Sequence, residues 1–352
     1  MENDNKNLKN DNKSNIKKII KNSVFFVILI ILTYYFIFRK IDRKGLQEAL
    51  SNTKLIYILI AAFFASFYIT CESLNHYRNL KVLKEKTSIK KCLKYGIVGF
   101  FFSAITPAAT GGQPVQVYYM HKDNISITNA TITILVQSFA YLTTMIILGI
   151  VGYIVNYNYI SNLGFIEYFF FIGVLVNGFI TSVCLIAMFS HNLSEKISNL
   201  IYKIIHRFNE EKANNFKEKF NVQLKEYHDS AKFILKNKKI LIKTFITTIV
   251  QLICYHSVAY FIFLSLGVNN INYIKITLLQ SVLYLSVSIL PLPGTVGVNE
   301  TGFSLIYNPI ISKTIVDSAM LLTRGVSFYL VVIITGLILL IISLKKKKDT
   351  SK

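Results

Sequence analysis

Two proline-containing interruptions inside long apolar segments constrain the fold of this 352-residue chain more than any other feature. All five prolines lie in the segments 95–120 and 275–312, and a cluster of Pro, Gly and Thr breaks each segment near its middle. Backbone that leaves helical geometry at membrane depth carries unpaired polar groups, so it persists only inside protein or beside a polar cavity. The pattern therefore predicts a membrane protein with a polar site between two broken helices.

The composition is that of an integral membrane protein. The chain is 53% hydrophobic and 16% charged, with a positive mean hydropathy. Six apolar runs are long enough to cross about 30 Å of hydrocarbon, at 20–38, 55–71, 130–155, 165–189, 240–266 and 314–344. We predict an all-α integral membrane protein with about six transmembrane helices.

The formal charge of +21 is concentrated in polar loops and at both ends of the chain. Basic residues favour cytoplasmic loops, so we expect a multi-pass protein of the cell membrane with both termini, 72–94 and 190–238 inside. The basic loop 39–54 conflicts with this topology, which places it outside. The other interpretation is tRNA binding, but acidic residues are interleaved in 190–238 and no nucleic-acid motif accompanies them. We therefore do not expect tRNA as a partner.

The loop assignments determine how the interrupted segments enter the membrane. Segment 95–120 begins and ends inside, so we predict a re-entrant hairpin from the cytoplasmic face. Segment 275–312 then forms a second hairpin from the external face, and both interruptions meet near the middle of the membrane. This arrangement resembles an inverted repeat. A shift of 186 residues aligns Pro107 with Pro293, Gly111 with Gly297 and Gln113 with Asn299.

The domain organisation follows from the same segments. We expect a disordered basic tail at 1–19, one polytopic membrane domain at 20–344 and a second basic tail at 345–352. Within the domain, 190–238 has apolar residues at helical spacing, which predicts amphipathic helices on the membrane surface.

Glu300 and Arg324 are the charged residues best placed for function. Glu300 follows the second interruption in a stretch with no other charge, where a carboxylate is costly unless it is paired or hydrated. We predict that Arg324, in the last span, pairs with Glu300 or with Asp317, or reaches a lipid phosphate through its forked donors. Such a pair either fixes helix packing or forms a coupling pair that lines a substrate site.

The glycines and amides of the interruptions are further candidates. Glycine lets backbone N–H groups approach an anion, and the helix that follows each interruption would add its positive end, although a simple helix break is the alternative. The amides either bind a lipid head group or satisfy freed backbone carbonyls. The candidate substrate-binding residues are Gly111, Gly112, Gln113, Gln116, Gly294, Gly297, Asn299, Glu300 and Arg324.

The remaining polar residues of the spans predict no metal site and no cofactor. The cysteines and histidines lack metal-ligand spacing, and we interpret the cysteines as small core residues. Four polar residues in spans are expected to join helices: Gln137, Gln251, His256 and Gln280.

These motifs resemble the flippase-like transmembrane family typified by the membrane half of lysylphosphatidylglycerol synthase. The resemblance covers nearly all of residues 20–344, and Thr295 departs from it, since the family usually has a second glycine there. The matching motifs are Thr106-Pro107 with Gly111-Gly112-Gln113-Pro114, Pro291-Leu292-Pro293-Gly294 with Gly297-Val298-Asn299-Glu300, Tyr77-Arg78-Asn79-Leu80, and Arg324 with the helix through Gly336.

The resemblance implies a module that moves phospholipids or lipid-linked precursors between leaflets, for example phosphatidylglycerol or its aminoacylated form. The alternative is a phosphatidylglycerol lysyltransferase, or its membrane component, because a soluble domain of the bifunctional synthases transfers lysine from lysyl-tRNA. We see no room for that domain here, so we expect no catalysis by the chain alone and consider a separate soluble aminoacyltransferase a candidate partner. A small-solute or ion transporter is a third interpretation, but no set of acidic or hydroxyl ligands suggests Na⁺ coordination.

Overall fold

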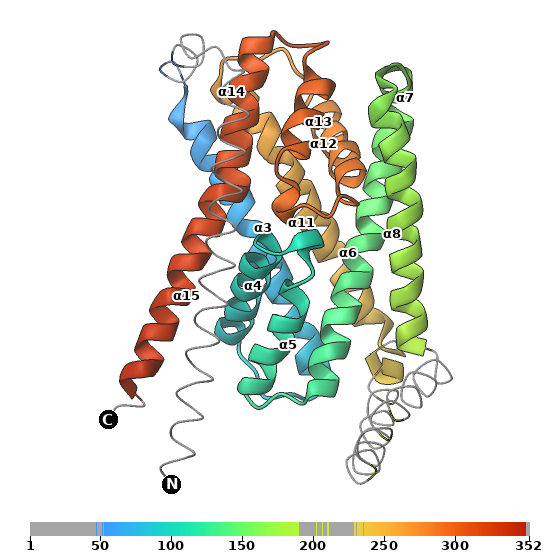
Figure 1. Ribbon diagram of the computed structural model, residues 1–352, viewed down its shortest axis with the longest axis vertical. Helices are drawn as coiled ribbons and strands as arrows, with labels where there is room; N and C mark the ends of the chain where they lie inside the picture. The colour runs from blue at the N-terminus through green and yellow to red at the C-terminus, as the bar shows by residue number, and fades with distance from the viewer. Residues whose placement is uncertain are drawn as a thin grey trace.

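The computed structural model describes residues 53–189, 231–234 and 236–349, with isolated positions in the gaps, and these parts consist of helices and connecting turns without strands (Figure 1). The expected tail 1–19, the expected span 20–38 and most of 190–238 lie outside the described residues. Within the described residues, five helices are long and apolar enough to cross a membrane. They are α3 (Leu55–Val82), α6 (Ile127–Val155), α8 (Phe165–Phe189), α11 (Lys238–Ser265) and the continuous pair α14 (Lys313–Arg324) and α15 (Leu330–Asp349).

The two interrupted segments form opposed helical hairpins, as predicted. The first is α4 (Ile89–Ala104), the turn η1 (Pro107–Ala109) and α5 (Gly112–Lys122). The second is α12 (Tyr273–Val287), the turn η3 (Pro293–Thr295) and α13 (Val298–Tyr307). Each arm is shorter than the roughly 20 residues that cross a membrane. The first hairpin fills the lower half of Figure 1 and the second the upper half, and the turns η1 and η3 contact each other between them.

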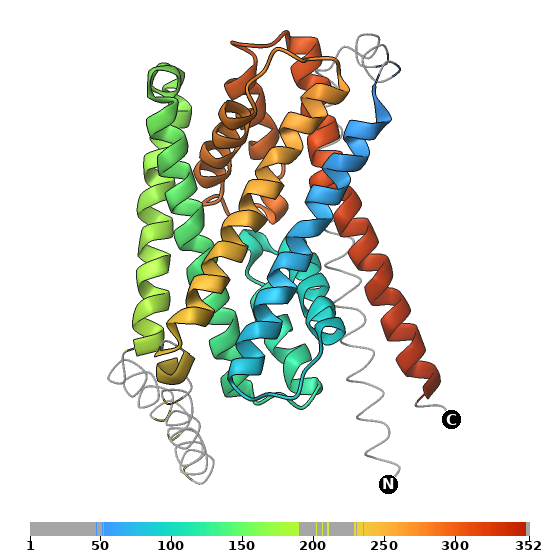
Figure 2. The ribbon, with the colours of Figure 1, turned by 180° about the vertical axis from the view of Figure 1, so that it is seen from behind.

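The elements repeat in the same order in two inverted halves. Helix α3, the first hairpin and α6 correspond to α11, the second hairpin and α14–α15. The turns, the arms that follow them and the next helices each lie 186 residues apart (107 to 293, 112 to 298, 127 to 313). Helices α3 and α11 pack side by side and run in opposite directions (Figure 2). The repeat expected from the sequence is therefore present in the order and direction of the helices.

The two turns also share an uncommon backbone conformation. After its proline, each turn has two consecutive residues with positive φ, Ala108 and Ala109 at 51° and 54°, and Gly294 and Thr295 at 58° and 51°. Left-handed backbone is unfavourable for residues with a Cβ atom, by roughly 1 kcal/mol or more each. The strained geometry is thus retained in both halves, even where the residues are not glycine.

One boundary predicted from the sequence is wrong. The second span was expected to end at residue 71 and to be followed by a loop, but α3 continues to Val82. Its last turns are polar on the face that packs against α11, where the Asn75 amide donates to the carbonyl oxygen of Thr244 and to the hydroxyl of Thr248. Protein partners replace water for these side chains, so the helix does not need to end at the first polar residue.

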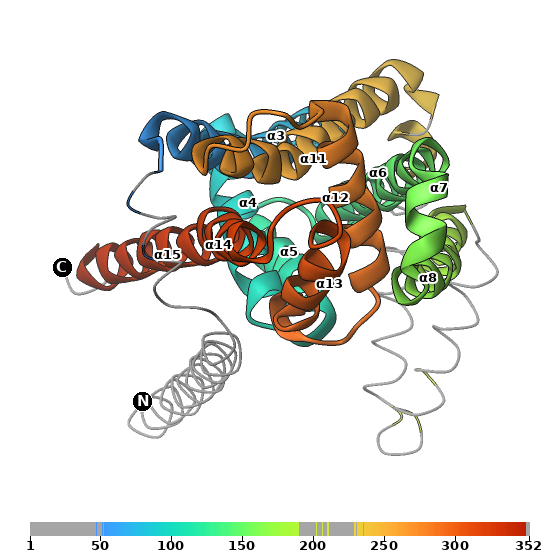
Figure 3. The same ribbon diagram turned by 90° about the horizontal axis from the view of Figure 1, so that it is seen from above.

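Seen from above, the hairpins lie at the centre of the molecule (Figure 3). Helices α3 and α11 cover one side, α6 and α8 a second, and α14–α15 a third. The outer helices present large apolar side chains outward, as Leu175 and Phe179 of α8 do at 73% and 70% exposure. This is the surface expected of a multi-pass membrane protein whose polar groups are kept inside.

Candidate functional site

A buried ion pair connects the second hairpin, next to its turn η3, with α14 of the last span. Glu300 and Arg324 are 3% and 5% exposed, and Arg324 Nε donates to Glu300 Oε1 at 2.8 Å. Arg324 Nη2 donates to the carbonyl oxygen of Gly294 at 2.7 Å, while the backbone N–H of Gly297 donates to Glu300 Oε2 at 2.6 Å. Of the three partners predicted for Arg324, the structure shows Glu300.

Aromatic rings complete the surroundings of Arg324. Its guanidinium lies 4.3 Å from the ring centroid of Phe328 and 5.8 Å from that of Tyr329, in the π-helical turn η4 (Gly325–Tyr329) between α14 and α15. Gly294 is required beside this ring, because an added Cβ would lie 2.0 Å from Phe328 and the residue has positive φ. The pair, the ring and the turn therefore form one packed unit.

Asp317 does not join this unit. It is half-buried on α14, and its electrostatic partner is Lys313. No hydrogen bond or ion pair in the described part of the chain links it to Arg324 or Glu300. The structure thus shows an ion pair of Glu300 and Arg324 with Asp317 apart, and a coupling role for these residues stays a prediction.

The glycines of the first interruption allow close packing. The N–H of Gly111 donates to the Thr106 hydroxyl at 2.9 Å, so this group is already used within the turn. An added Cβ at Gly112 would lie 2.6 Å from the carbonyl oxygen of Gly99 on α4. These contacts agree with the helix-break interpretation of the first glycine pair.

The two hairpins differ in exposure and in how they are held. Residues 107–110 and Gln113 are exposed, whereas Pro293, Asn299 and Glu300 of the second hairpin are buried. Gln113 Nε2 donates to the hydroxyl of Ser138 on α6 at 2.8 Å. By the 186-residue shift Ser138 corresponds to Arg324 and Gln113 to Asn299, the neighbour of Glu300, so a neutral hydrogen bond lies close to the place that the ion pair takes in the second half.

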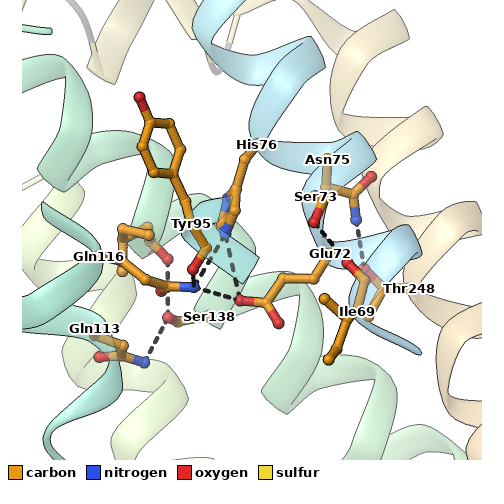
Figure 4. Close-up of polar contacts among 11 residues, drawn as sticks. Ile69, Glu72, Ser73, Asn75, His76, Tyr95, Gln113, Gln116, Ser138 and Thr248 are labelled. Atoms are coloured by element: carbon orange, nitrogen blue, oxygen red, sulfur yellow. Dashed lines mark hydrogen bonds and ion pairs between the residues drawn. The ribbon is translucent and has the colours of Figure 1, made fainter. Parts of the chain in front are cut away.

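A second polar cluster, absent from the sequence predictions except for Gln116, joins the first hairpin to α3 (Figure 4). Gln116 is 3% exposed, and its Nε2 donates to Glu72 Oε1 at 2.7 Å and to the carbonyl oxygen of Tyr95 at 3.2 Å. His76 is fully buried, with Nε2 3.3 Å from Glu72 Oε1 and 3.4 Å from Gln116 Nε2. The helical spacing of Glu72 and His76 was the available signal, and it was missed because 72–94 was assigned to a loop.

Tyrosines lie between the two polar clusters. The ring of Tyr255 is 5.2 Å from that of Tyr68 and 5.8 Å from that of Tyr284. The hydroxyl of Tyr141 donates to that of Tyr284 at 3.0 Å. These contacts join tyrosines of α3, α6, α11 and α12.

Two of the four polar span residues expected to join helices do so. His256 Nδ1 lies 2.8 Å from the hydroxyl of Ser281, and Gln280 donates to the hydroxyl of Tyr307. Gln251 is fully buried, and neither of its side-chain polar atoms has a partner in the described part of the chain, where the Gln137 oxygen is unpaired as well. Among the described residues, no group of three or more His, Cys, Asp or Glu is arranged to hold a metal ion.

Comparison with known proteins identifies relatives along most of the chain. An UPF0104 membrane protein of Archaeoglobus fulgidus is 20% identical over 279 residues, covering 78% of this chain and 81% of the relative. An UPF0104 membrane protein of Pyrococcus horikoshii is 21% identical, covering 82% of this chain and 88% of the relative. One of Methanothermobacter thermautotrophicus is 21% identical, with coverages of 81% and 85%.

A family match covers the described hairpins and both halves of the repeat. Residues 22–335 match the family described as the lysylphosphatidylglycerol synthase TM region. The match includes the broken hairpins, the ion pair of Glu300 and Arg324, and the cluster around Glu72. The chain therefore belongs to the family of the lysylphosphatidylglycerol synthase transmembrane region.

Proposed function

We propose that this protein moves an amphipathic lipid between the two leaflets of a cell membrane. The observation that carries the proposal is the meeting of two opposed, proline-broken hairpins beside a buried ion pair. Inverted repeats of this kind allow alternating access, because each half can adopt the conformation of the other. The lipid tails would stay in the hydrocarbon while the head group passes the polar middle of the protein.

The chemistry of the middle region suits a phosphate-bearing head group. Arg324 presents the planar donors that favour phosphate oxygens, and the tyrosine hydroxyls and the exposed Gln113 add neutral donors. The substrate class is a phospholipid, such as phosphatidylglycerol or its aminoacylated form, or a lipid-linked precursor. During translocation the phosphate would compete with Glu300 for Arg324, which releases the second turn from the last span.

A lipid-translocation assay tests the proposal. The full chain is reconstituted with fluorescent phosphatidylglycerol, and a membrane-impermeant quencher reports the lipid that reaches the outer leaflet. We expect faster translocation than in empty liposomes, and a loss of about tenfold or more in Glu300→Gln, the rate equivalent of about 1.4 kcal/mol. The matched control is Glu167→Gln, whose carboxylate on α8 accepts a hydrogen bond from Tyr153 on α6 and not from a hairpin residue.

Equal rates in empty liposomes, wild-type liposomes and Glu300→Gln liposomes would contradict the proposal. A parallel incubation with labelled lysyl-tRNA and phosphatidylglycerol separates transport from lysine transfer. Labelled aminoacyl lipid formed by the purified chain alone would assign the transferase function instead.

A further inference from the structure

We propose that Glu72 and His76 form a proton-binding site that controls the docking of the first hairpin and couples proton movement to lipid movement. The coupling rests on the proposed lipid translocation, whereas the proton-controlled docking does not. In this cluster, a carboxylate on a spanning helix holds one arm of a broken hairpin.

The charge state of the cluster is the first argument. Glu72 lies about 15 Å along α3 from the end of that helix at Val82, and its side chain is 15% exposed. An ionised carboxylate beside a neutral imidazole leaves one uncompensated negative charge on a membrane-spanning helix, which is costly. One proton added to the pair would remove that charge.

The imidazole of His76 has a free position for that proton. Its Nε2 faces Glu72 Oε1, so with the carboxylate ionised Nε2 is the nitrogen that carries hydrogen. Its Nδ1 is buried and has no hydrogen-bond partner among the described residues. Nδ1 therefore holds the lone pair, and proton uptake there yields an imidazolium ion paired with Glu72.

Among the described residues, no lysine or arginine forms an ion pair with Glu72. From α4, Lys94 and the Tyr95 hydroxyl are both bonded to Asp123. Arg78 lies about 9 Å further along α3 and keeps its positive charge, but it donates to the hydroxyl of Thr247 on α11. The elements packed against α3 also carry titratable side chains: Tyr68 and Cys71 of α3 itself, Tyr141 of α6, Cys254 and Tyr255 of α11, and Tyr329 of η4.

A polar route leads from the pair toward the end of α3. Asn75 Oδ1 and Asn79 Nδ2 lie between Glu72 and Val82, are fully buried and have no partner among the described residues. Buried polar atoms of this kind are normally satisfied by water. A hydrated path along these asparagines would connect the pair with the aqueous phase at the α5 end of the bundle.

Proton uptake changes how the first hairpin is held. Without the proton, Gln116 Nε2 donates to an ionised carboxylate, which is a strong, charge-assisted hydrogen bond. With the proton on Nδ1, the imidazolium neutralises the charge of Glu72, and its positive ring lies beside the Gln116 donor, with the two Nε2 atoms 3.4 Å apart. The bond from Gln116 weakens, so α5 separates from α3. One proton is bound when the hairpin is released and one is given up when it docks again.

Hydrogen exchange of α5 tests the docking step directly. The detergent-solubilised full chain is compared at about pH 8.5 and about pH 5.5, which bracket the ordinary imidazole pKa, after correction for intrinsic exchange. We expect residues 112–122 to lose about tenfold in protection at the lower pH. Glu72→Gln and His76→Gln should remove this pH dependence, while Glu167→Gln should keep it.

Gly99→Ala provides a second, non-titrating perturbation. A Cβ at Gly99 would lie 2.0 Å from Gln116 Nε2, so the amide must leave Glu72. This variant should show low protection of α5 at both pH values. An unchanged pH response of α5 in Glu72→Gln and His76→Gln, or no response in the wild type, would overturn the proposal.

Transport with and without a pH gradient tests the coupling. In proteoliposomes, a gradient should accelerate wild-type translocation several-fold in one direction, and Glu72→Gln should translocate at the same rate with or without it. If the wild-type protein translocates lipid at the same rate with and without the gradient, the coupling is wrong and the proposed function still stands. Absence of any translocation overturns the proposed function together with the coupling, and hydrogen exchange then decides the docking step alone.

Discussion

At the residue scale, Glu300 and Arg324 form a buried ion pair in which each charge depends on the other. Both side chains are nearly fully buried and each satisfies the other together with the backbone of the second turn. Removing one member of such a pair leaves a buried charge without a partner, which costs about 3–5 kcal/mol. The sequence predicted that each charge needs a partner, but it left Glu300, Asp317 and a lipid phosphate open for Arg324.

Arg324→Leu should therefore destabilise the protein strongly, because Glu300 loses its counterion. The double variant Glu300→Leu with Arg324→Leu should be more stable than Arg324→Leu alone, since no charge remains buried. Thermal unfolding in detergent measures both. A double variant less stable than either single variant would contradict the argument.

A second prediction at this scale concerns Asp123, at the end of α5. Burial acts to raise the pKa of Asp123, but hydrogen bonds from Lys94 and Tyr95 outweigh it and hold the pKa below its usual range. A lowered folded-state pKa gives stability that is present above about pH 4 and is lost as the pH falls through the folded value. Asp123→Asn should lower the Tm at pH 7, and the difference from wild type should shrink below about pH 3.

At the scale of the elements, the broken hairpins could be predicted and the length of α3 could not. Prolines fix the position of each break through local chemistry, so the turns at Pro107 and Pro293 follow from the sequence. Helix α3 continues past Glu72 because its partners come from α5 and α11, far away in the chain. Sequence patterns show that a residue is polar, but they do not show which distant residue will satisfy it.

The packing of α4 against α5 gives a prediction for the hairpin as a unit. Gly112→Val would force a side chain against the backbone carbonyl of Gly99, which cannot move without shifting α4. We expect loss of protection in both arms of the first hairpin and a lower Tm, with the second hairpin unchanged. Gly178→Val on α8 is the matched control, because nothing lies within 4 Å of an added Cβ there. Equal effects of the two substitutions would contradict this packing argument.

At the scale of the whole molecule, the inverted halves meet at the two turns. The 186-residue shift predicted this symmetry from three aligned pairs, and the structure extends it to the order of all the corresponding helices. The turns share their left-handed geometry but differ in exposure. The symmetry could be predicted because proline and glycine leave a local signature, whereas the difference in exposure depends on the assembled bundle.

Cross-linking the turns should stop lipid movement if their separation is part of the cycle. In a background without the four native cysteines, Thr110→Cys and Thr295→Cys place one thiol at each turn for a short bifunctional reagent. We expect cross-linking to reduce translocation at least tenfold and a cleavable reagent to allow recovery. Full translocation by the cross-linked protein would show that the turns need not part. Each single-cysteine variant, treated in the same way, is the control.

The two hairpins are held by different interactions, and this difference affects the resting state. Gln113 and Ser138 share a neutral hydrogen bond, whereas the corresponding positions in the other half include Arg324 with its buried counterion. Every 1.4 kcal/mol of difference in the cost of opening changes the relative populations tenfold. Under the proposed translocation, we therefore expect the two hairpins to open with different frequencies and the resting protein to favour access from one leaflet.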